Sequence, residues 1–137
     1  LSMLKVPHYL STFVETLEVS PYVIWAMLVL IYILLGCLID GFDLMLVTTP
    51  VFYPIITNTL GFDPIWFGVT LVVLLEMSLI TPPVGLNLFV THSIGGGERL
   101  METIIGILPF LVIMVICIVI LTVFPALVTY LPSLMTR

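Results

Sequence analysis

Oxygen-bearing groups that could bind a cation cluster at two interruptions of an otherwise apolar sequence. Thr48 and Thr49 stand directly before a proline at the first interruption, and Thr81 begins the second, which runs on to Gly85. A helix unwound at such a point exposes backbone carbonyl oxygens, and hydroxyl and carbonyl oxygens are hard donors that suit sodium rather than a transition metal. We therefore predict that a sodium ion is bound, partly through backbone oxygens, by Thr48, Thr49, Thr81 and Gly85.

The residues that follow the second interruption could bind an anion. Two consecutive prolines followed by Gly85 break a helix strongly, so a second half-helix is expected to start close to Asn87. The first N–H groups of a helix are unpaired, and its dipole is positive at that end, which favours a negatively charged group. We predict that the substrate site and the tip of a neighbouring hairpin are formed by Asp40, Asp43, Pro82, Pro83 and Asn87.

Three acids stand in or beside the apolar segments. Asp40 and Asp43 follow directly after an apolar run of membrane-spanning length, and Glu76 lies about one turn before the second interruption. An ionisable group within a membrane segment is by default a functional hypothesis. The alternatives are that the two aspartates cap a helix at an aqueous end, and that Glu76 is a structural carboxyl rather than a proton carrier. His92 is interpreted as a packed or interfacial histidine.

The composition is that of a membrane protein. Hydrophobic residues make up 61% of the sequence and charged residues only 8%, whereas a soluble domain carries roughly 25% charged residues. With three basic residues and a net charge of -5, the chain offers no phosphate-binding surface, so a nucleic acid is excluded as a partner. Cys37 and Cys117 lie inside apolar runs and are interpreted as buried thiols, while Trp25 and Trp66 are interpreted as membrane-belt anchors or packing residues.

The apolar runs predict an all-α membrane protein, a bundle of several helices. Leu44–Leu60 is interrupted by Pro50 and Pro54, which favours two short arms around a polar tip, a re-entrant hairpin, over one straight span. Asp63 is expected to cap the next helix. We expect an amphipathic or interfacial segment at 1–20 and a membrane domain at 21–137, with the hairpin at about 22–60, a discontinuous helix at about 64–94 and a final transmembrane helix at about 103–131.

The sequence opens at Leu1 without the basic region and cleavage site of a signal peptide, and we interpret it as a fragment that lacks an N-terminal part. It carries no motif of a serine hydrolase, a zinc protease or a nucleotide-binding loop. We therefore predict no enzymatic activity and no cofactor, and any uphill transport would draw on an ion gradient.

Several strings in the sequence resemble the large membrane subunit, the DctM-type permease, of tripartite ATP-independent periplasmic (TRAP) transporters. The resemblance runs from about Pro21 to the end, and its most specific part is the string that begins at Thr81. Ser78 departs from it, because a glycine is expected there. The strings are Gly36-Cys37-Leu38-Ile39-Asp40, Thr49-Pro50-Val51-Phe52-Tyr53-Pro54, Leu60-Gly61-Phe62-Asp63-Pro64-Ile65-Trp66-Phe67-Gly68, Leu79-Ile80-Thr81-Pro82-Pro83-Val84-Gly85-Leu86-Asn87-Leu88-Phe89 and Leu108-Pro109-Phe110.

This resemblance implies a fold of two inverted repeats, each with a re-entrant hairpin and a broken helix, in an elevator-type transporter. The chain would then be the second repeat alone, with the hairpin tip near Asp40–Pro50 and the first repeat missing. The resemblance further implies sodium-coupled import of small organic acids of the dicarboxylate or sugar-acid type. The expected partners are a periplasmic solute-binding protein, a small membrane subunit and the lipid bilayer, in the cytoplasmic (inner) membrane of a bacterium or archaeon.

Two other interpretations stay open at this stage. The chain could belong to another sodium- or proton-coupled family of anion carriers, and proton coupling would then give weight to Glu76. It could also be a membrane subunit that only scaffolds partners, although a scaffold has no use for broken helices at membrane depth.

Overall fold

The computed structural model describes residues 18–82, 85–96 and 99–135, together with Tyr9, Thr12, Phe13, Glu15 and Thr16. Most of the predicted interfacial segment at 1–20 therefore lies outside the described residues. The described part of the chain is helical. Its elements are α2 (Pro21–Gly36), α3 (Gly41–Pro54), the π-helix η1 (Ile55–Thr59), α4 (Pro64–Ile80), α5 (Leu86–Ile94), α6 (Leu100–Val123) and α7 (Ala126–Met135).

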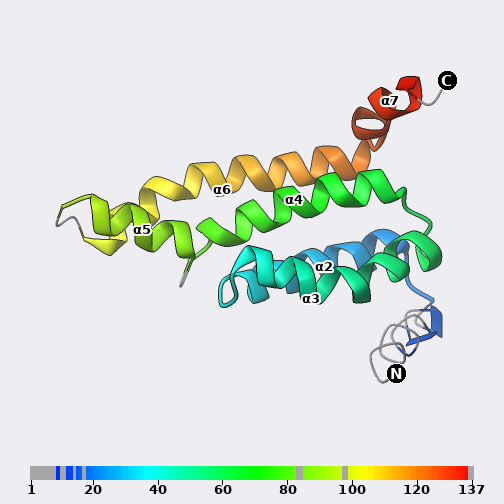
Figure 1. Cartoon of the computed structure of the whole chain (residues 1–137), viewed down its shortest axis with the longest axis horizontal. Coiled ribbons are helices and arrows are strands. Elements are labelled where there is room, and N and C mark those ends of the chain that lie inside the picture. Colours follow the sequence, from blue (N-terminus) through cyan, green and yellow to red (C-terminus); the bar gives the residue numbers. More distant parts are fainter. Residues whose placement is uncertain are drawn as a thin grey trace.

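Helix α4 is the centre of the arrangement. It contacts α2, α3, α5, α6 and α7. Helices α2 and α4 run in the same direction and α3 and α6 run in the opposite one, so that α2 and α4 end on the same side of the molecule (Figure 1). The start of α4 follows the local sequence signals, as expected: the Asp63 side chain accepts hydrogen bonds from the N–H groups of Ile65 at 2.8 Å and Trp66 at 3.2 Å, and Pro64 occupies the first turn.

An aromatic cluster joins the starts of α2 and α4. The rings of Phe62 and Trp66 stack at 4.6 Å, and Trp25 lies 4.9 Å from Trp66 between ring centroids. Both indoles also donate hydrogen bonds to α6, that of Trp25 to the Thr122 hydroxyl at 3.1 Å and that of Trp66 to the Leu121 carbonyl at 2.6 Å. The tryptophans are buried, so of the two interpretations the structure supports packing rather than a membrane belt.

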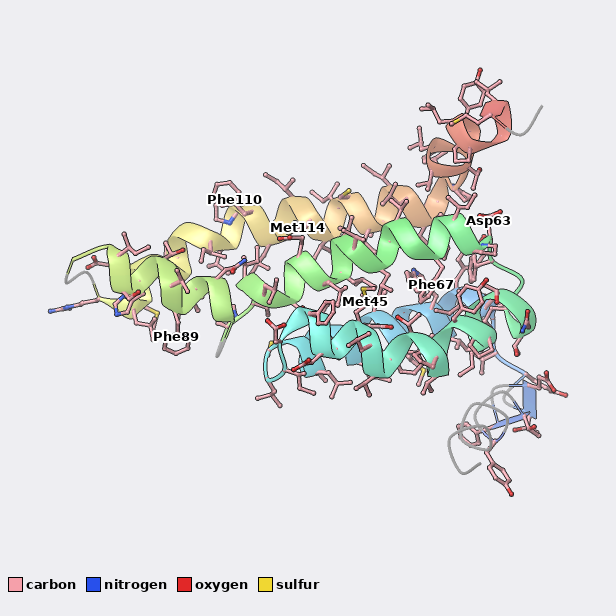
Figure 2. All side chains as sticks on the ribbon, in the orientation of Figure 1. Met45, Asp63, Phe67, Phe89, Phe110 and Met114 are labelled. Atoms are coloured by element: carbon pink, nitrogen blue, oxygen red, sulfur yellow. The ribbon has the colours of Figure 1, made fainter. Side chains whose placement is uncertain are left out.

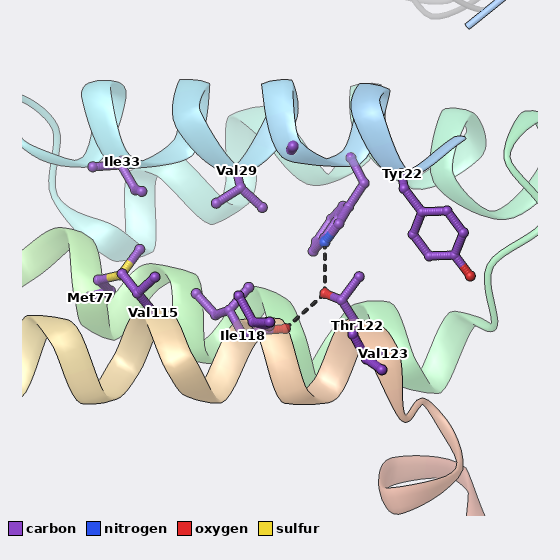
Figure 3. Close-up of a pocket in the computed structure, with 11 residues that line it drawn as sticks. Tyr22, Val29, Ile33, Met77, Val115, Ile118, Thr122 and Val123 are labelled. Carbon is purple, nitrogen blue, oxygen red and sulfur yellow. Dashed lines mark hydrogen bonds between the residues drawn. The ribbon is translucent and has the colours of Figure 1, made fainter. Parts of the chain in front are cut away.

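An apolar groove of about 260 Å³ lies between α2, α4 and α6 (Figure 3). Val29 and Ile33 of α2 face Val115 and Ile118 of α6 across it, and the hydrogen bond from Trp25 to Thr122 crosses it between Val29 and Tyr22. The groove has almost no polar lining, so the predicted site residues do not belong to it.

The segment Leu44–Leu60 does not form two short arms around a polar tip. Helix α3 passes through Pro50 without a break and continues from Pro54 into η1, and the turn of the hairpin lies earlier, between Gly36 and Gly41. A proline inside a helix removes one N–H donor and crowds the carbonyl four residues before it, and in apolar surroundings neighbouring helices and hydroxyls often compensate for the lost hydrogen bond. The wider hydrogen-bonding turn of η1 follows the second proline.

The last long helix begins and ends earlier than the predicted range of 103–131. Helix α6 starts at Leu100 and stops at Val123, and α7 is a separate helix. Phe124 has φ -120° and ψ 67°, outside the helical region, because the residue before Pro125 is pushed out of that region by the proline ring. Pro109, by contrast, is accommodated inside α6.

Among the described residues, α6 is the one helix long and apolar enough to cross a membrane. Its side chains project outward along most of its length, and Phe110 is one of them (Figure 2). Helices α2 and α4 are apolar but shorter. The re-entrant placement of the hairpin and the elevator-type half-transporter stay predictions.

Gly36 at the end of α2 offers a test of this packing. A Cβ atom there would overlap the Cβ and Oγ of Ser78 on α4. We expect Gly36→Ala to lower the free energy of unfolding of the intact protein by roughly 1–3 kcal/mol, because overpacking forces the helices apart. Tryptophan fluorescence during thermal unfolding in detergent measures the effect.

The second substitution Ser78→Gly removes both atoms that the new methyl group of Gly36→Ala would meet, so the double variant should regain most of the loss. Gly106→Ala on α6 serves as the control, because nothing lies within 4 Å of a Cβ at that position. A double variant no more stable than Gly36→Ala alone would contradict the close contact of α2 with α4.

Candidate functional site

Four helix ends meet where the hairpin turn touches the interruption between α4 and α5 (Figure 1). Gly36 lies against Ser78, and a Cβ on Gly41 would lie 3.5 Å from the side chain of Leu79. The Cys37 thiol donates a hydrogen bond to the Pro82 carbonyl at 3.5 Å. The ends of α2 and α4 present carbonyl oxygens and the starts of α3 and α5 present N–H groups, so a cation and an anion can both be stabilised here.

The backbone at the interruption explains why carbonyls there have no partner among the described residues. The Leu79 carbonyl would accept from residue 83 in a continuous helix, but Pro83 has no N–H to donate. Gly85 has φ +37°, and a Cβ on it would lie 2.9 Å from the Thr81 carbonyl oxygen and 3.0 Å from that of Leu79. Two carbonyl oxygens therefore converge on Gly85, and a side chain there would press against them.

Thr81 is half-buried and extended, with ψ 125°. Its hydroxyl donates to the Met77 carbonyl at 2.6 Å. That bond uses the hydroxyl hydrogen and leaves the oxygen lone pairs available to a cation. Thr81 thus brings its backbone carbonyl close to Gly85 and has a hydroxyl oxygen that can still accept, while its role as a sodium ligand stays a prediction.

The other two predicted sodium ligands lie elsewhere. Thr48 is buried and donates to the Leu44 carbonyl at 2.6 Å, and the enclosed Thr49 hydroxyl has no hydrogen-bond partner among the described residues. They are the eighth and ninth residues of α3, about 10 to 12 Å along its axis from Gly41. Gly41 itself lies against Leu79 at the junction, so this length of α3 separates the Thr48 and Thr49 hydroxyls from Thr81 and Gly85.

The two aspartates occupy the start of α3. Asp40 is exposed and caps the helix, because its Oδ2 accepts the Phe42 N–H at 3.1 Å. Asp43 is exposed in the first turn, where a negative charge favours the helix dipole. Both aspartates therefore lie as the capping interpretation predicts, at the exposed start of α3. This start is at the same end of the hairpin as the interruption.

The remaining predicted residues lie around α4 and α5. Asn87 is exposed in the first turn of α5, and Pro82 is half-buried. Pro83 lies outside the described residues. Glu76 is exposed on α4 rather than turned into the bundle. His92 is half-buried, and its Nδ1 has no partner in the described part of the chain.

Two residues, one at this junction and one beside Thr48, were not identified as functional from the sequence. Cys37, interpreted only as a buried thiol, links the hairpin turn to the interruption through Pro82. Tyr32 is fully buried one turn before Gly36, stacks edge-on against Phe52 at 5.4 Å, and places its hydroxyl beside Thr48 without a hydrogen bond of regular geometry. Both residues make their contacts with residues distant in sequence, which a short sequence pattern does not predict. The one available sequence signal was the position of Cys37 next to the polar turn.

Comparison with known proteins matches residues 1–127 to the DctM component of the tripartite ATP-independent periplasmic transporter. The chain belongs to the DctM family. It is thus related to transporter permeases, which are integral to the membrane, and not to enzymes. The family interpretation made from the sequence is confirmed, and the alternative of a different carrier family is set aside.

Curated relatives include two C4-dicarboxylate TRAP transporter large permease proteins, DctM of Pseudomonas aeruginosa (36% identical over 94% of this chain) and DctM of Vibrio cholerae (31% over 96%). The sialic acid TRAP transporter large permease protein SiaM of Vibrio cholerae is 30% identical over 95% of this chain. The chain spans only 28% to 30% of the length of these three relatives. No solved structure matches it.

Gly85 gives the most direct test of the converging carbonyls. Gly85→Ala in a full-length DctM permease should weaken sodium binding at least tenfold, because the new methyl group would displace the Thr81 and Leu79 carbonyls. Thermal stabilisation by sodium chloride, relative to choline chloride, measures the binding. Gly106→Ala is the control, and an unchanged sodium response in Gly85→Ala would mean that these carbonyls hold no ion.

Proposed function

We propose that this chain is the C-terminal part of a TRAP permease that imports small organic acids together with sodium across the cytoplasmic membrane of a bacterium or archaeon. A periplasmic solute-binding protein would deliver the solute, and a small membrane subunit would complete the transporter. The observation that supports this function best is the meeting of four helix ends at the Thr81–Gly85 interruption in a member of the DctM family.

The cation would be held by oxygens of the interruption. The carbonyls of Leu79 and Thr81 converge on Gly85, and the Thr81 hydroxyl oxygen is free to accept. All three are uncharged hard donors, which suit a monovalent cation that must also be released. The Thr48 and Thr49 pair, with no partner for the Thr49 hydroxyl among the described residues, is the candidate for a second, separate group of donors in α3.

The anion would lie at the start of α5. Its first N–H groups have no helical partners, and the exposed Asn87 adds a side-chain amide there. None of the three basic residues of the sequence is available for this role by position: Arg99 lies between α5 and α6, and Lys5 and Arg137 are near the chain ends. Within this chain, a bound carboxylate would therefore find its counter-charge at the helix start and at the nearby sodium.

This arrangement offers a reason for coupling. Sodium at the carbonyls lies next to the anion at the helix start, so each ion lowers the electrostatic cost of binding the other. The relatives named for C4-dicarboxylates and for sialic acid both act on carboxylate-bearing solutes. We extend that class, small organic acids of the dicarboxylate or sugar-acid type, to this chain.

Uptake into proteoliposomes tests the proposal. The full-length permease, its small subunit and its binding protein are supplied with a labelled C4-dicarboxylate or with sialic acid, with and without an inward sodium gradient. We expect Thr81→Val to abolish sodium-driven uptake and Thr81→Ser to retain most of it, because only the serine keeps a hydroxyl oxygen. Asp40→Asn should also lose most uptake if the carboxylate does more than cap α3.

Thr129→Val on α7, which lies away from the interruption, is the matched control. Sodium-dependent uptake that survives both Thr81→Val and Asp40→Asn would contradict the assignment of the site. Uptake that ignores sodium, follows a pH gradient and is lost in Glu76→Gln would instead indicate coupling to protons.

A further inference from the structure

One face of the central helix α4 is uncovered in this structure. Gly68, Val69, Val72 and Glu76 are all exposed, at spacings that place them on one side of the helix. We call these four residues the α4 stripe. The opposite side of α4 is buried, with Phe67, Leu71 and Leu74 in the core. Although α4 contacts more helices than any other element described here, no described residue covers this face of it.

Glu76 lies at the level of the middle of α6, the helix that is long and apolar enough to cross a membrane. Its neighbour Met77 lines the apolar groove together with Val115 of α6 (Figure 3). One turn further along α4, Ile80 shares a cavity with Ile113 and Met114. Since α6 extends from Leu100 to Val123, these contacts place Glu76 several residues away from either end of the span.

A carboxyl group at that depth is costly without a partner. A charged acid at the centre of a membrane helix costs about 2.5–3.5 kcal/mol on insertion scales. Within the described residues, Glu76 has neither a hydrogen bond nor an ion pair. The exposed face of α6 differs, because between Thr103 and Val123 it carries no charged residue and suits contact with lipid.

Gly68 adds an independent observation. Nothing lies within 4 Å of a Cβ built on it. In the middle of a helix, glycine costs roughly 1 kcal/mol relative to alanine, and at membrane interfaces small residues allow a second helix backbone to come close. An exposed glycine on the same face as a carboxyl that has no partner in the described ranges indicates a surface shaped for another helix rather than for lipid.

We propose that the α4 stripe is the docking surface for a transmembrane helix from the remainder of the DctM polypeptide. This helix passes closest at Gly68 and places a hydrogen-bond donor opposite Glu76. The chain covers 30% of the length of its Pseudomonas relative, so about 70% of such a permease remains to supply the helix. A second copy of the stripe fits poorly, because two-fold symmetry would bring two Glu76 carboxyls together.

The inference rests on membership of the DctM family and not on sodium coupling, so its test needs no uptake. Spin labels are placed at Val72 in the stripe and at Val112 on α6, in a cysteine-free full-length permease in bilayers. These two valines are equally exposed here, at 57% each. We expect collisions with dioxygen to be several-fold rarer at Val72, and both labels to be shielded from a polar nickel chelate.

Equal dioxygen access at the two positions would mean that lipid covers the stripe and would overturn the proposal. High access of the nickel chelate to Val72 would also overturn it, because Glu76 would then line a water-filled path. The measurement is repeated with the permease alone and with the small subunit added. Protection that appears only with the small subunit would show that the occupant is not part of the DctM polypeptide.

Paired glycine variants test the close approach. Gly68→Leu should raise the dioxygen access of the Val72 label and lower the melting temperature of the permease, because leucine holds the docked helix away. Gly106→Leu on α6 should do neither, although its surroundings are equally open here. Equal behaviour of the two variants would contradict a helix at Gly68. Glu76→Gln, which keeps hydrogen-bonding capacity, should be better tolerated than Glu76→Leu.

Discussion

The absence of two backbone N–H groups determines how the centre of this structure is built. Because Pro82 and Pro83 cannot donate, α4 cannot continue past Ile80, and the Leu79 carbonyl loses its helical partner. In apolar surroundings such an oxygen needs another favourable interaction. Gly85 lies against this oxygen, and α5 starts directly afterwards. One local feature thus provides both the carbonyl oxygens and the helix start that the proposed cation and anion sites would use.

The hairpin is held against this interruption by small residues. Gly36 leaves the space that Ser78 fills, and the Ser78 hydroxyl satisfies itself on the Leu75 carbonyl at 2.7 Å. Serine in place of the expected glycine is therefore accommodated by the glycine opposite it. The contact of Gly36 with Ser78 packs α2 closely against α4. The contact of Cys37 with Pro82 is only a weak thiol hydrogen bond, so the hairpin turn is held less tightly to the interruption than α2 is to α4.

The features that could be predicted from the sequence are local ones. The features that could not be predicted result from packing between residues far apart in the sequence. The Asp63 cap follows from one residue and its neighbours, and the helix is interrupted where Pro82 and Gly85 required it. Pro50 was misjudged because the cost of a proline depends on what surrounds the freed carbonyl. The separation of Thr48 from Thr81, and the outward direction of Glu76, depend on how helices are rotated against each other, which no short pattern encodes.

The distribution of polar groups along α4 connects these features. At its start, Trp66 of α4 and the neighbouring Trp25 of α2 donate their N–H groups to α6 and bury their rings, so this end is fixed by contacts within the chain. At its far end, the Leu79 and Thr81 carbonyls have no such partners among the described residues, and Glu76 lies one turn before them. In the proposals made above, ions would contact the unsatisfied end of α4 and a further helix would cover its exposed face. The unsatisfied end is therefore the part of α4 on which binding, and any movement that depends on binding, can act.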